Sequence, residues 1–397
     1  METGTLPSAL FLSPEAPYPL AGGGALRSAS LLEYLGRRYK VDAVLFREPG
    51  APDPSRQIPP QLVDRVLILD LPHHSRHPLA RLARTAARLA RGVPPLPDRF
   101  SGFACHVRDF LRGRHYQLAL IEHSWCAPYW EQVAPNSESV VLDLHNIESV
   151  LMARRAEVAG FPAAGVFRRF ERVTREMERV WLPRFSWLLA ASEPDAKLIQ
   201  AASPASRVLA YPNVLPFTPA PDAAEEHVIA FSGNLEYDPN ADAVRHFHRR
   251  IWPLLRSRWP KLIWRLIGKH PEAVRGRLEG DARIELTGPP DDAIRALASS
   301  QVVVAPLRIA SGTRVKILEA WAAGRGVVST TLGAEGLPAR DGANLLIADR
   351  PEAFAQAVSR LLESAELRHR LGAAGRRLYE AEFTWETAWS RLAAAGM

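Results

Sequence analysis

Short apolar runs alternate with amphipathic segments along most of the chain. The runs have the length of strands and cover residues 9–13, 41–46, 65–69, 118–121, 139–142, 186–191, 228–234, 263–267, 283–286, 301–305 and 326–330. Apolar residues between the runs recur at helical spacing, as Leu26, Ala29, Leu32 and Leu35 do. Such alternation builds parallel sheets with helices on both faces, and the loops that follow the strands then share one edge. The pattern predicts an α/β fold of the doubly wound type.

A proline-rich stretch, residues 212–221, divides this pattern into two halves. The chain has 397 residues, which is the length of about two domains. We therefore expect one domain over residues 1–210 and a second that begins at residue 211.

The composition indicates a folded protein of the cytoplasm. Hydrophobic residues make up 47% of the chain and charged residues 23%, which suits large buried cores. The two cysteines, Cys105 and Cys126, have neither the number nor the spacing of a disulfide framework or a zinc site. No apolar run approaches the roughly 20 residues of a membrane span, and the first residues lack the basic start of a signal peptide.

The net charge of +7 is concentrated in one stretch. Residues 76–114 contain nine arginines against only Asp98 and Asp109. Within this stretch, residues 79–91 predict a basic amphipathic helix, which is either solvated and packed on the sheet or in contact with an anionic membrane surface. The second alternative would place the protein peripherally on the inner face of the membrane. Few aromatic residues are interleaved with these arginines, so we do not expect nucleic-acid binding.

Residues 302–324 predict a strand, a loop and a helix that together form an anion-binding site. The loop contains Ser311, Gly312 and Thr313, and the free N–H groups at the start of the following helix would point at a ligand there. Arg314 and Lys316 add two cations. An anionic ligand that also carries hydroxyl groups, such as a nucleotide diphosphate-sugar, would use all of these groups.

A second strand, glycine loop and helix occur near the N-terminus, where Gly22, Gly23 and Gly24 precede a helix. The pattern is not a dinucleotide fingerprint, because Arg27 stands where the third glycine would be, and no Gly-Lys-Ser/Thr of a P-loop follows. An anion site and a plain turn are both open for these glycines.

The segment Ser311-Gly-Thr-Arg-Val-Lys-Ile-Leu-Glu-Ala320 resembles the retaining GT-B glycosyltransferases of the group 1 (family 4) class, in the subgroup with an S-G-T-R-x-K-x-L-E-A donor motif. The resemblance implies two Rossmann-like domains that face each other across a cleft. It implies an acceptor-side domain over 1–210, a donor domain over 211–375, and a final helix over 376–397 that crosses back to the first domain.

The same resemblance implies an activity. The protein would be a hexosyltransferase-like enzyme of exopolysaccharide biosynthesis, which moves a sugar from a nucleotide diphosphate-sugar to a polysaccharide or lipid-linked acceptor with retention. No cofactor is expected, and no Asp-x-Asp at a strand end suggests a metal ion.

The resemblance also implies roles for individual residues. His145, just beyond the strand over 139–142, would contact the donor sugar. Arg314 and Lys316 would stabilise the leaving diphosphate, and Glu319 would accept hydrogen bonds from the ribose hydroxyls. The other donor-side and acceptor-side positions are Gly233, Asn234, Ser311, Gly312 and Thr313 for the donor, and Gly22, Gly23, Gly24 and Arg27 for the diphosphate and acceptor.

The chain departs from the family pattern at three positions. The lysine of the family's diphosphate clamp is replaced within Asp238-Pro-Asn240. Asn234 stands where the family has an arginine of its diphosphate clamp, and Ser311 replaces the first glutamate of the E-x7-E motif. Two other functions therefore stay open. One is a sugar-nucleotide epimerase on the same fold, for which His145 and Glu148 are the acid/base candidates, and the other is a non-catalytic nucleotide-sugar sensor or membrane adaptor.

Overall fold

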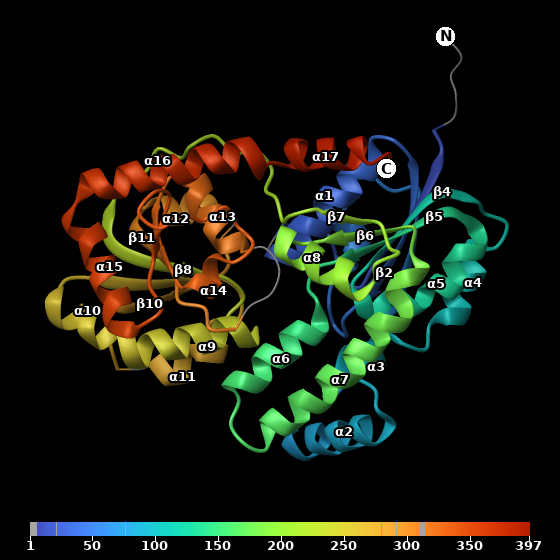
Figure 1. Ribbon diagram of the computed structural model, residues 1–397, viewed down its shortest axis with the longest axis horizontal. Coiled ribbons are helices and arrows are strands. Elements are labelled where there is room, and N and C mark those ends of the chain that lie inside the picture. Colours follow the sequence, from blue (N-terminus) through green and yellow to red (C-terminus); the bar gives the residue numbers. More distant parts are fainter. Residues whose placement is uncertain (1–5, 21, 76, 279, 291, 310–313) are drawn as a thin grey trace, which may run out of the picture. The chain divides into compact units, whose positions relative to one another are not determined.

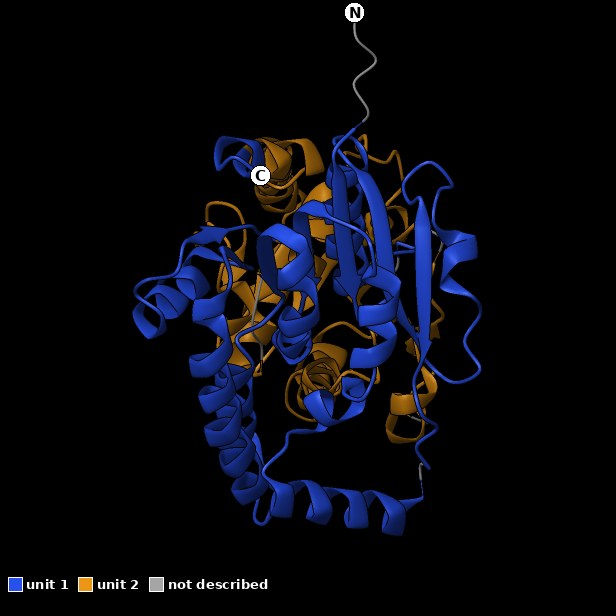
Figure 2. Ribbon diagram, turned by 90° about the vertical axis from the view of Figure 1, so that its right-hand side faces the viewer, with its two compact units in different colours: residues 1–212, 391–397 blue, residues 213–390 orange. Residues whose placement is uncertain are grey.

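The computed structural model describes the chain except for residues 1–5, 21, 76, 279, 291 and 310–313. The chain forms two compact units, Met1–Pro212 with Arg391–Met397 and Asn213–Ser390 (Figure 2). Each unit has its own parallel sheet and its own apolar core.

The sheet of unit 1 has seven parallel strands in the order β3-β2-β1-β4-β5-β6-β7. The strands are β1 (Ser8–Ser13), β2 (Lys40–Arg47), β3 (Arg65–Asp70), β4 (Tyr116–Glu122), β5 (Ser137–Leu144), β6 (Trp187–Ala190) and β7 (Val208–Ala210). Residues 9–13 of β1 are all buried, whichever face they point to, because helices cover both faces of the sheet.

Twelve helical segments surround this sheet among the described residues (Figure 1). They are α1 (Gly23–Gly36), η1 (Pro54–Gln57), α2 (Pro78–Arg91), α3 (Pro95–Phe100), α4 (Ala104–Leu111), η2 (Ser124–Tyr129), α5 (Trp130–Val133), η3 (Ala134–Asn136), α6 (Glu148–Val158), α7 (Ala163–Trp181), η4 (Leu182–Arg184) and α8 (Glu193–Ala202). Helices α6 and α7 pack against each other as a hairpin, and α2 lies beside α7.

Unit 2 repeats the same design with six parallel strands in the order β10-β9-β8-β11-β12-β13. Its strands are β8 (Glu226–Ser232), β9 (Ile263–Ile267), β10 (Ile284–Thr287), β11 (Ser300–Ala305), β12 (Gly326–Ser329) and β13 (Leu346–Ile347). Its helices are α9 (Asp238–His246), the π-helical η5 (Phe247–Ile251), α10 (Trp252–Arg258), α11 (Glu272–Leu278), α12 (Ala293–Ala298), α13 (Val315–Ala322), α14 (Thr331–Ala334), α15 (Pro351–Glu363), α16 (Ala365–Glu382) and the first part of α17 (Trp385–Ala394).

The last residues of the chain, Arg391–Met397, belong to unit 1, where the Tyr34 hydroxyl donates a hydrogen bond to the carbonyl of Met397. Among the described residues, none of the helices combines the length and the apolar character needed to cross a bilayer.

The structure confirms the predicted parallel α/β organisation, with two short additions. The strands β7 and β13 were not predicted, and they are only three and two residues long. A run of that length gives no period that could distinguish a strand from a loop.

Candidate active site

The candidate residues lie at the carboxyl edges of the two sheets, where the strand order reverses. In unit 2 this point lies between β8 and β11, and in unit 1 between β1 and β4. Ligands of open α/β sheets bind at such points, because the loops on either side diverge there and leave a crevice.

In unit 2, the loop after β8 is built around Gly233. Its backbone has a φ of 145°, and its N–H donates to the carbonyl of Ile267 at 2.9 Å. A Cβ atom on Gly233 would lie 2.7 Å from the Asn240 side chain, and one on Gly268 would lie 1.9 Å from the Gly233 carbonyl oxygen. Glycine at both positions therefore allows the loops after β8 and β9 to touch.

The ammonium group of Lys316 lies beside this glycine loop. Its Nζ donates to Asn240 Oδ1 at 2.9 Å and lies 5.0 Å from the centre of the Phe231 ring. A Cβ atom on Gly233 would be 3.5 Å from the same Nζ. Removal of the ammonium from water, together with the charge of Arg314, lowers the pKa of Lys316 to about 8. An anion at this loop would restore the ordinary preference for the charged form.

Glu319 lies three residues further along α13, on the same face as Lys316. Its Oε2 accepts a hydrogen bond of 3.0 Å from Ser232 Oγ at the end of β8. Burial raises the pKa of Glu319 above its ordinary value. The structure thus places a lysine and a carboxyl group together at the end of β8.

Arg314 does not join this pair. Its guanidinium donates to the carbonyl of Leu332 at 3.1 Å and lies 3.3 Å from the Glu335 carboxylate, and its side chain is only 4% exposed. Arg314 is the N-cap of α13, two residues before Lys316, and its backbone is not helical. The two predicted cations therefore point to different surroundings.

The remaining predicted donor residues fall into two groups. Ser311, Gly312 and Thr313 lie outside the described residues. Asn234 has a local role, because its Oδ1 accepts from the Glu236 N–H at 3.0 Å and its carbonyl accepts from Asn240 Nδ2 at 2.9 Å. The Asn234 side chain stabilises the turn after β8 and supplies no charge in place of the family's arginine.

In unit 1, Arg27 and Asp143 form a fully buried ion pair. The Arg27 Nε donates to Asp143 Oδ2 at 2.8 Å, a second guanidinium nitrogen contacts Oδ1, and a third donates to the carbonyl of Tyr211. Neither side chain of the pair is exposed. The sequence placed Arg27 in a diphosphate or acceptor loop, but its guanidinium is enclosed and holds Asp143.

His145 lies against this pair. Its Nε2 is 3.1 Å from Asp143 Oδ2 and 3.5 Å from Glu122 Oε1, while Glu122 Oε2 accepts a bond of 2.7 Å from Ser28 Oγ. Burial alone would lower the pKa of His145, but its contacts with the two carboxylates outweigh burial and raise the pKa to about 9. His145 is therefore an imidazolium at neutral pH, held at the carboxyl edge of β5.

Two residues of this cluster were missed by the sequence reasoning, Glu122 and His123 at the end of β4. His123 has a φ of 66° and stacks between Trp125 and His145, with ring centroids 4.0 Å and 3.7 Å away. Its Nε2 is buried without a hydrogen-bond partner among the described residues, and burial together with His145 and Arg27 holds its pKa well below the usual value. Both residues are polar and lie just after the apolar run over 118–121. This position could have identified them, because His145 likewise lies just beyond the end of an apolar run.

Ligand atoms of Glu122, Asp143 and His145 lie within 4.8 Å of one another, as in a metal site. However, both oxygens of Asp143 contact Arg27. Two carboxylates, one guanidinium and one imidazolium sum to zero, so the cluster is neutral without an added cation. A metal ion would have to displace the Arg27 contacts.

The glycine loop of unit 1 opens α1. Gly22 is the N-cap of that helix and has a φ of 95°, which favours glycine, while Gly23 is its first residue. A Cβ atom on Gly24 would lie 2.2 Å from the Glu15 carboxylate, so a negative group of the chain itself stands beside this helix start.

Part of the chain matches a model of a known protein family. Residues 226–364 match the family model of the "Glycosyl transferases group 1", and this segment contains Gly233, Asn234, Lys316 and Glu319. A comparison with curated protein sequences found no significant match.

Solved structures resemble the whole chain. Sucrose-phosphate synthase from Thermosynechococcus elongatus has a TM-score of 0.73 at 17% identity, with 98% of each chain covered. HepE from Anabaena, solved with UDP and glucose, has a TM-score of 0.67 at 15% identity, with 98% of this chain and 99% of that chain covered. S. aureus TarM, solved with Fondaparinux, alpha-GlcNAc-glycerol and UDP, has a TM-score of 0.67 at 11% identity and the same coverage.

The chain has the GT-B fold. In GT-B terms, unit 1 is the N-terminal and unit 2 the C-terminal Rossmann-like domain, and the group 1 match lies within the C-terminal domain. The Lys316–Glu319 pair belongs to that domain, and the His145 cluster belongs to the other.

Proposed function

We propose that the protein is a glycosyltransferase that moves a sugar from a nucleotide diphosphate-sugar to a glycan or lipid-linked acceptor. The observation that carries the proposal is the placement of Lys316 and Glu319 together at the glycine loop after β8, inside the segment that matches group 1 glycosyltransferases. UDP-sugars are the first donors to test, because the structures of HepE and TarM were solved with UDP.

In this proposal Lys316 and Glu319 bind different parts of the nucleotide. The Lys316 ammonium faces the diphosphate and stabilises the negative charge that grows on it as the bond to the sugar breaks. The Glu319 carboxyl accepts hydrogen bonds from the ribose hydroxyls. Gly233 and Gly268 allow the loops after β8 and β9 to stay in contact, because neither residue carries a side chain.

In unit 1, the His145 imidazolium would donate a hydrogen bond to a sugar hydroxyl. Its partners Asp143 and Glu122 hold its orientation and its charge, and Arg27 in turn holds Asp143. We further propose that the transfer retains the anomeric configuration and uses no metal ion, with the leaving diphosphate taking the proton of the acceptor hydroxyl.

The helix α2 supports a peripheral membrane location for this activity. None of its residues is buried, and its apolar face exposes Leu79 and Leu82 by 70% and 67%. Arginines occupy the rest of its surface, so an anionic bilayer would match both its apolar face and its charge.

A non-catalytic sensor is the second candidate, because neither Asn234 nor Arg314 supplies the charge of the family's clamp to the glycine loop. The test incubates the purified protein with UDP-glucose or UDP-GlcNAc in water and follows the products by proton NMR. Released UDP and an initial α-anomer of the free sugar support a retaining transferase. Binding without turnover identifies a sensor, and a changed sugar still linked to UDP identifies an epimerase.

A further inference from the structure

Unit 1 contains an apolar pocket that the proposed chemistry does not use. It lies between α3, η2, α6 and α7 and encloses about 590 Å3 of unfilled space when its open mouth is included. Apolar side chains form most of its lining: Pro94, Pro95, Leu96, Pro97, Trp125, Ala127, Met152, Met177, Trp181 and Leu182. Such a lining takes up an apolar group from water.

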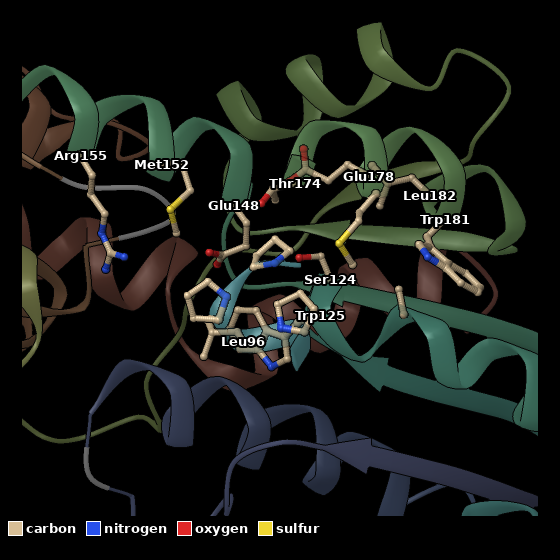
Figure 3. A pocket seen from close by; sticks show the side chains of 15 residues that line it. Leu96, Ser124, Trp125, Glu148, Met152, Arg155, Thr174, Glu178, Trp181 and Leu182 are labelled. Carbon is tan, nitrogen blue, oxygen red and sulfur yellow. The ribbon is translucent and has the colours of Figure 1, made fainter. Parts of the chain in front are cut away.

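The polar residues of the lining are Ser124, Glu148, Arg155, Thr174 and Glu178. Figure 3 shows the Glu148 carboxyl and the Met152 sulfur turned toward the same space. Burial raises the pKa of Glu148 to about 7, so near neutral pH this group carries a proton in about half of the molecules. Glu148 also interacts with the Asn146 side chain and with the charge of Arg155. Glu178 accepts hydrogen bonds from the Ser149 hydroxyl and N–H.

One polar atom of the lining has no partner among the described residues. The Trp125 Nε1 is buried and makes no hydrogen bond with any described residue. Trp125 stacks on His123, which stacks on His145. A molecule in the pocket would therefore present its polar end close to the charged cluster at the carboxyl edge of the unit 1 sheet.

The proline-rich part of the pocket lining, residues 94–97, follows α2 in the chain. After Gly92 ends that helix, the chain runs directly into the prolines of the lining. Arg88 and Arg91 hold the two elements together, since both donate to Asp98 of α3, at 2.8 Å and 2.7 Å. The exposed apolar face of α2 and the pocket thus belong to one connected region.

We propose that this pocket binds the apolar chain of a lipid-linked acceptor, with the head of that chain at Glu148 and Trp125. The inference rests on the proposed function, because it takes the protein to have an acceptor. A free sugar suits the pocket less well, because a hydroxylated ring needs many hydrogen-bond partners, and Glu178 is already engaged. The basic face of α2 matches the anionic surface on which such a lipid resides.

The first test uses methyl, hexyl and octyl β-D-glucosides as probes and follows the fluorescence of the protein's tryptophans, two of which line the pocket. We expect affinity to rise by about fourfold for each methylene group that enters. The variant Met152→Trp, which fills the pocket, should abolish this dependence on chain length. The control Leu198→Gln, at an exposed leucine of α8, should preserve it. Equal affinity for the three probes, or unchanged dependence in Met152→Trp, would overturn the proposal.

The second test keeps the wild-type sequence, so it is independent of whether a variant folds. An octyl glucoside with a photoreactive diazirine at its chain end is cross-linked to the protein, and the labelled peptides are identified by mass spectrometry. Labelling of α3, α6 or α7 supports the pocket, whereas labelling confined to α2 overturns it. UDP binding is measured on the same samples. UDP binding without pocket labelling refutes only the lipid pocket, and pocket labelling without UDP binding refutes only the proposed donor function.

Discussion

The ionisation of Lys316 makes the pH dependence of UDP binding a direct test of the donor site. With a pKa of about 8, roughly nine in ten molecules carry the ammonium at pH 7 and roughly one in ten at pH 9. A bound diphosphate favours the ammonium, because opposite charges at contact distance raise the pKa of a lysine. If only the charged form binds UDP tightly, the dissociation constant should weaken by about tenfold between pH 7 and pH 9.

The assay is isothermal titration calorimetry of UDP at a series of pH values, without metal ions. The variant Lys316→Met should bind more weakly at pH 7 and should lose most of the pH dependence, while the ionisation of UDP itself is unchanged. The matched control is Lys261→Met, because Lys261 is exposed and precedes β9, at the opposite edge of the sheet. This control should follow the wild-type curve.

The calorimetry also counts protons. Repeating the titration near pH 8 in buffers of different ionisation enthalpy should show that the protein takes up a proton when UDP binds. Equal affinity at pH 7 and pH 9, or the same pH profile in Lys316→Met and the wild type, would refute the assignment of Lys316 to the diphosphate.

Three further predictions concern unit 1. Arg27→Met leaves Asp143 buried without its main partner, so the free energy of unfolding should fall by about 3–5 kcal/mol in chemical denaturation, and a loss below about 1 kcal/mol would contradict the account. The pKa of His145 is raised to about 9. The charged imidazole therefore contributes fully to the free energy of unfolding below pH 6.5, and this contribution is lost as the pH rises to 9. Stability in that window should drop by up to about 3 kcal/mol more in the wild type than in His145→Gln, and equal slopes would argue against a charged His145. Leu82→Gln should weaken binding to anionic vesicles by about tenfold or more, because a buried leucine contributes about 1.5–3 kcal/mol, while Leu198→Gln should bind like the wild type in the same sedimentation assay.

The parallel α/β fold was predictable because its strands are buried on both faces. A buried strand such as β11 is a continuous apolar run, and the amphipathic helices between such runs leave few other architectures. The resemblance of the Ser311–Ala320 segment indicated the GT-B arrangement. The short strand β7 lacked a period, and its place at the end of the sheet depends on pairing with β6.

The arrangement of the candidate donor residues was only partly predictable, for a geometric reason. Lys316 and Glu319 are three residues apart on a helix, so their common face follows from the sequence. The sequence also showed Arg314 beside them, but its backbone at the N-cap of α13 is not helical, and its side chain contacts Leu332 and Glu335. The number of charged residues near a motif does not show which of them point into the candidate site and which make contacts within the domain.

The charged cluster of unit 1 could not be derived from the sequence. Arg27 and Asp143 are separated by 116 residues, and no local pattern shows that the two will pair. Burial of Arg27 follows from its position on the first helix only once the strand order is known. His123 could have been proposed, because it directly follows an apolar run that ends at the same sheet edge as the run before His145.

We propose above that a nucleotide diphosphate-sugar binds at Lys316 and Glu319. The most direct measurement is metal-free calorimetry of UDP-, GDP-, ADP- and TDP-sugars with the wild type, with Glu319→Gln, and with Glu352→Gln as an exposed control. The account predicts that one nucleotide class binds the wild type and the control, and that Glu319→Gln weakens this binding about tenfold or more, as expected when a hydrogen-bonded charge is lost. Absence of binding for all four classes, or equal binding by Glu319→Gln, would contradict it.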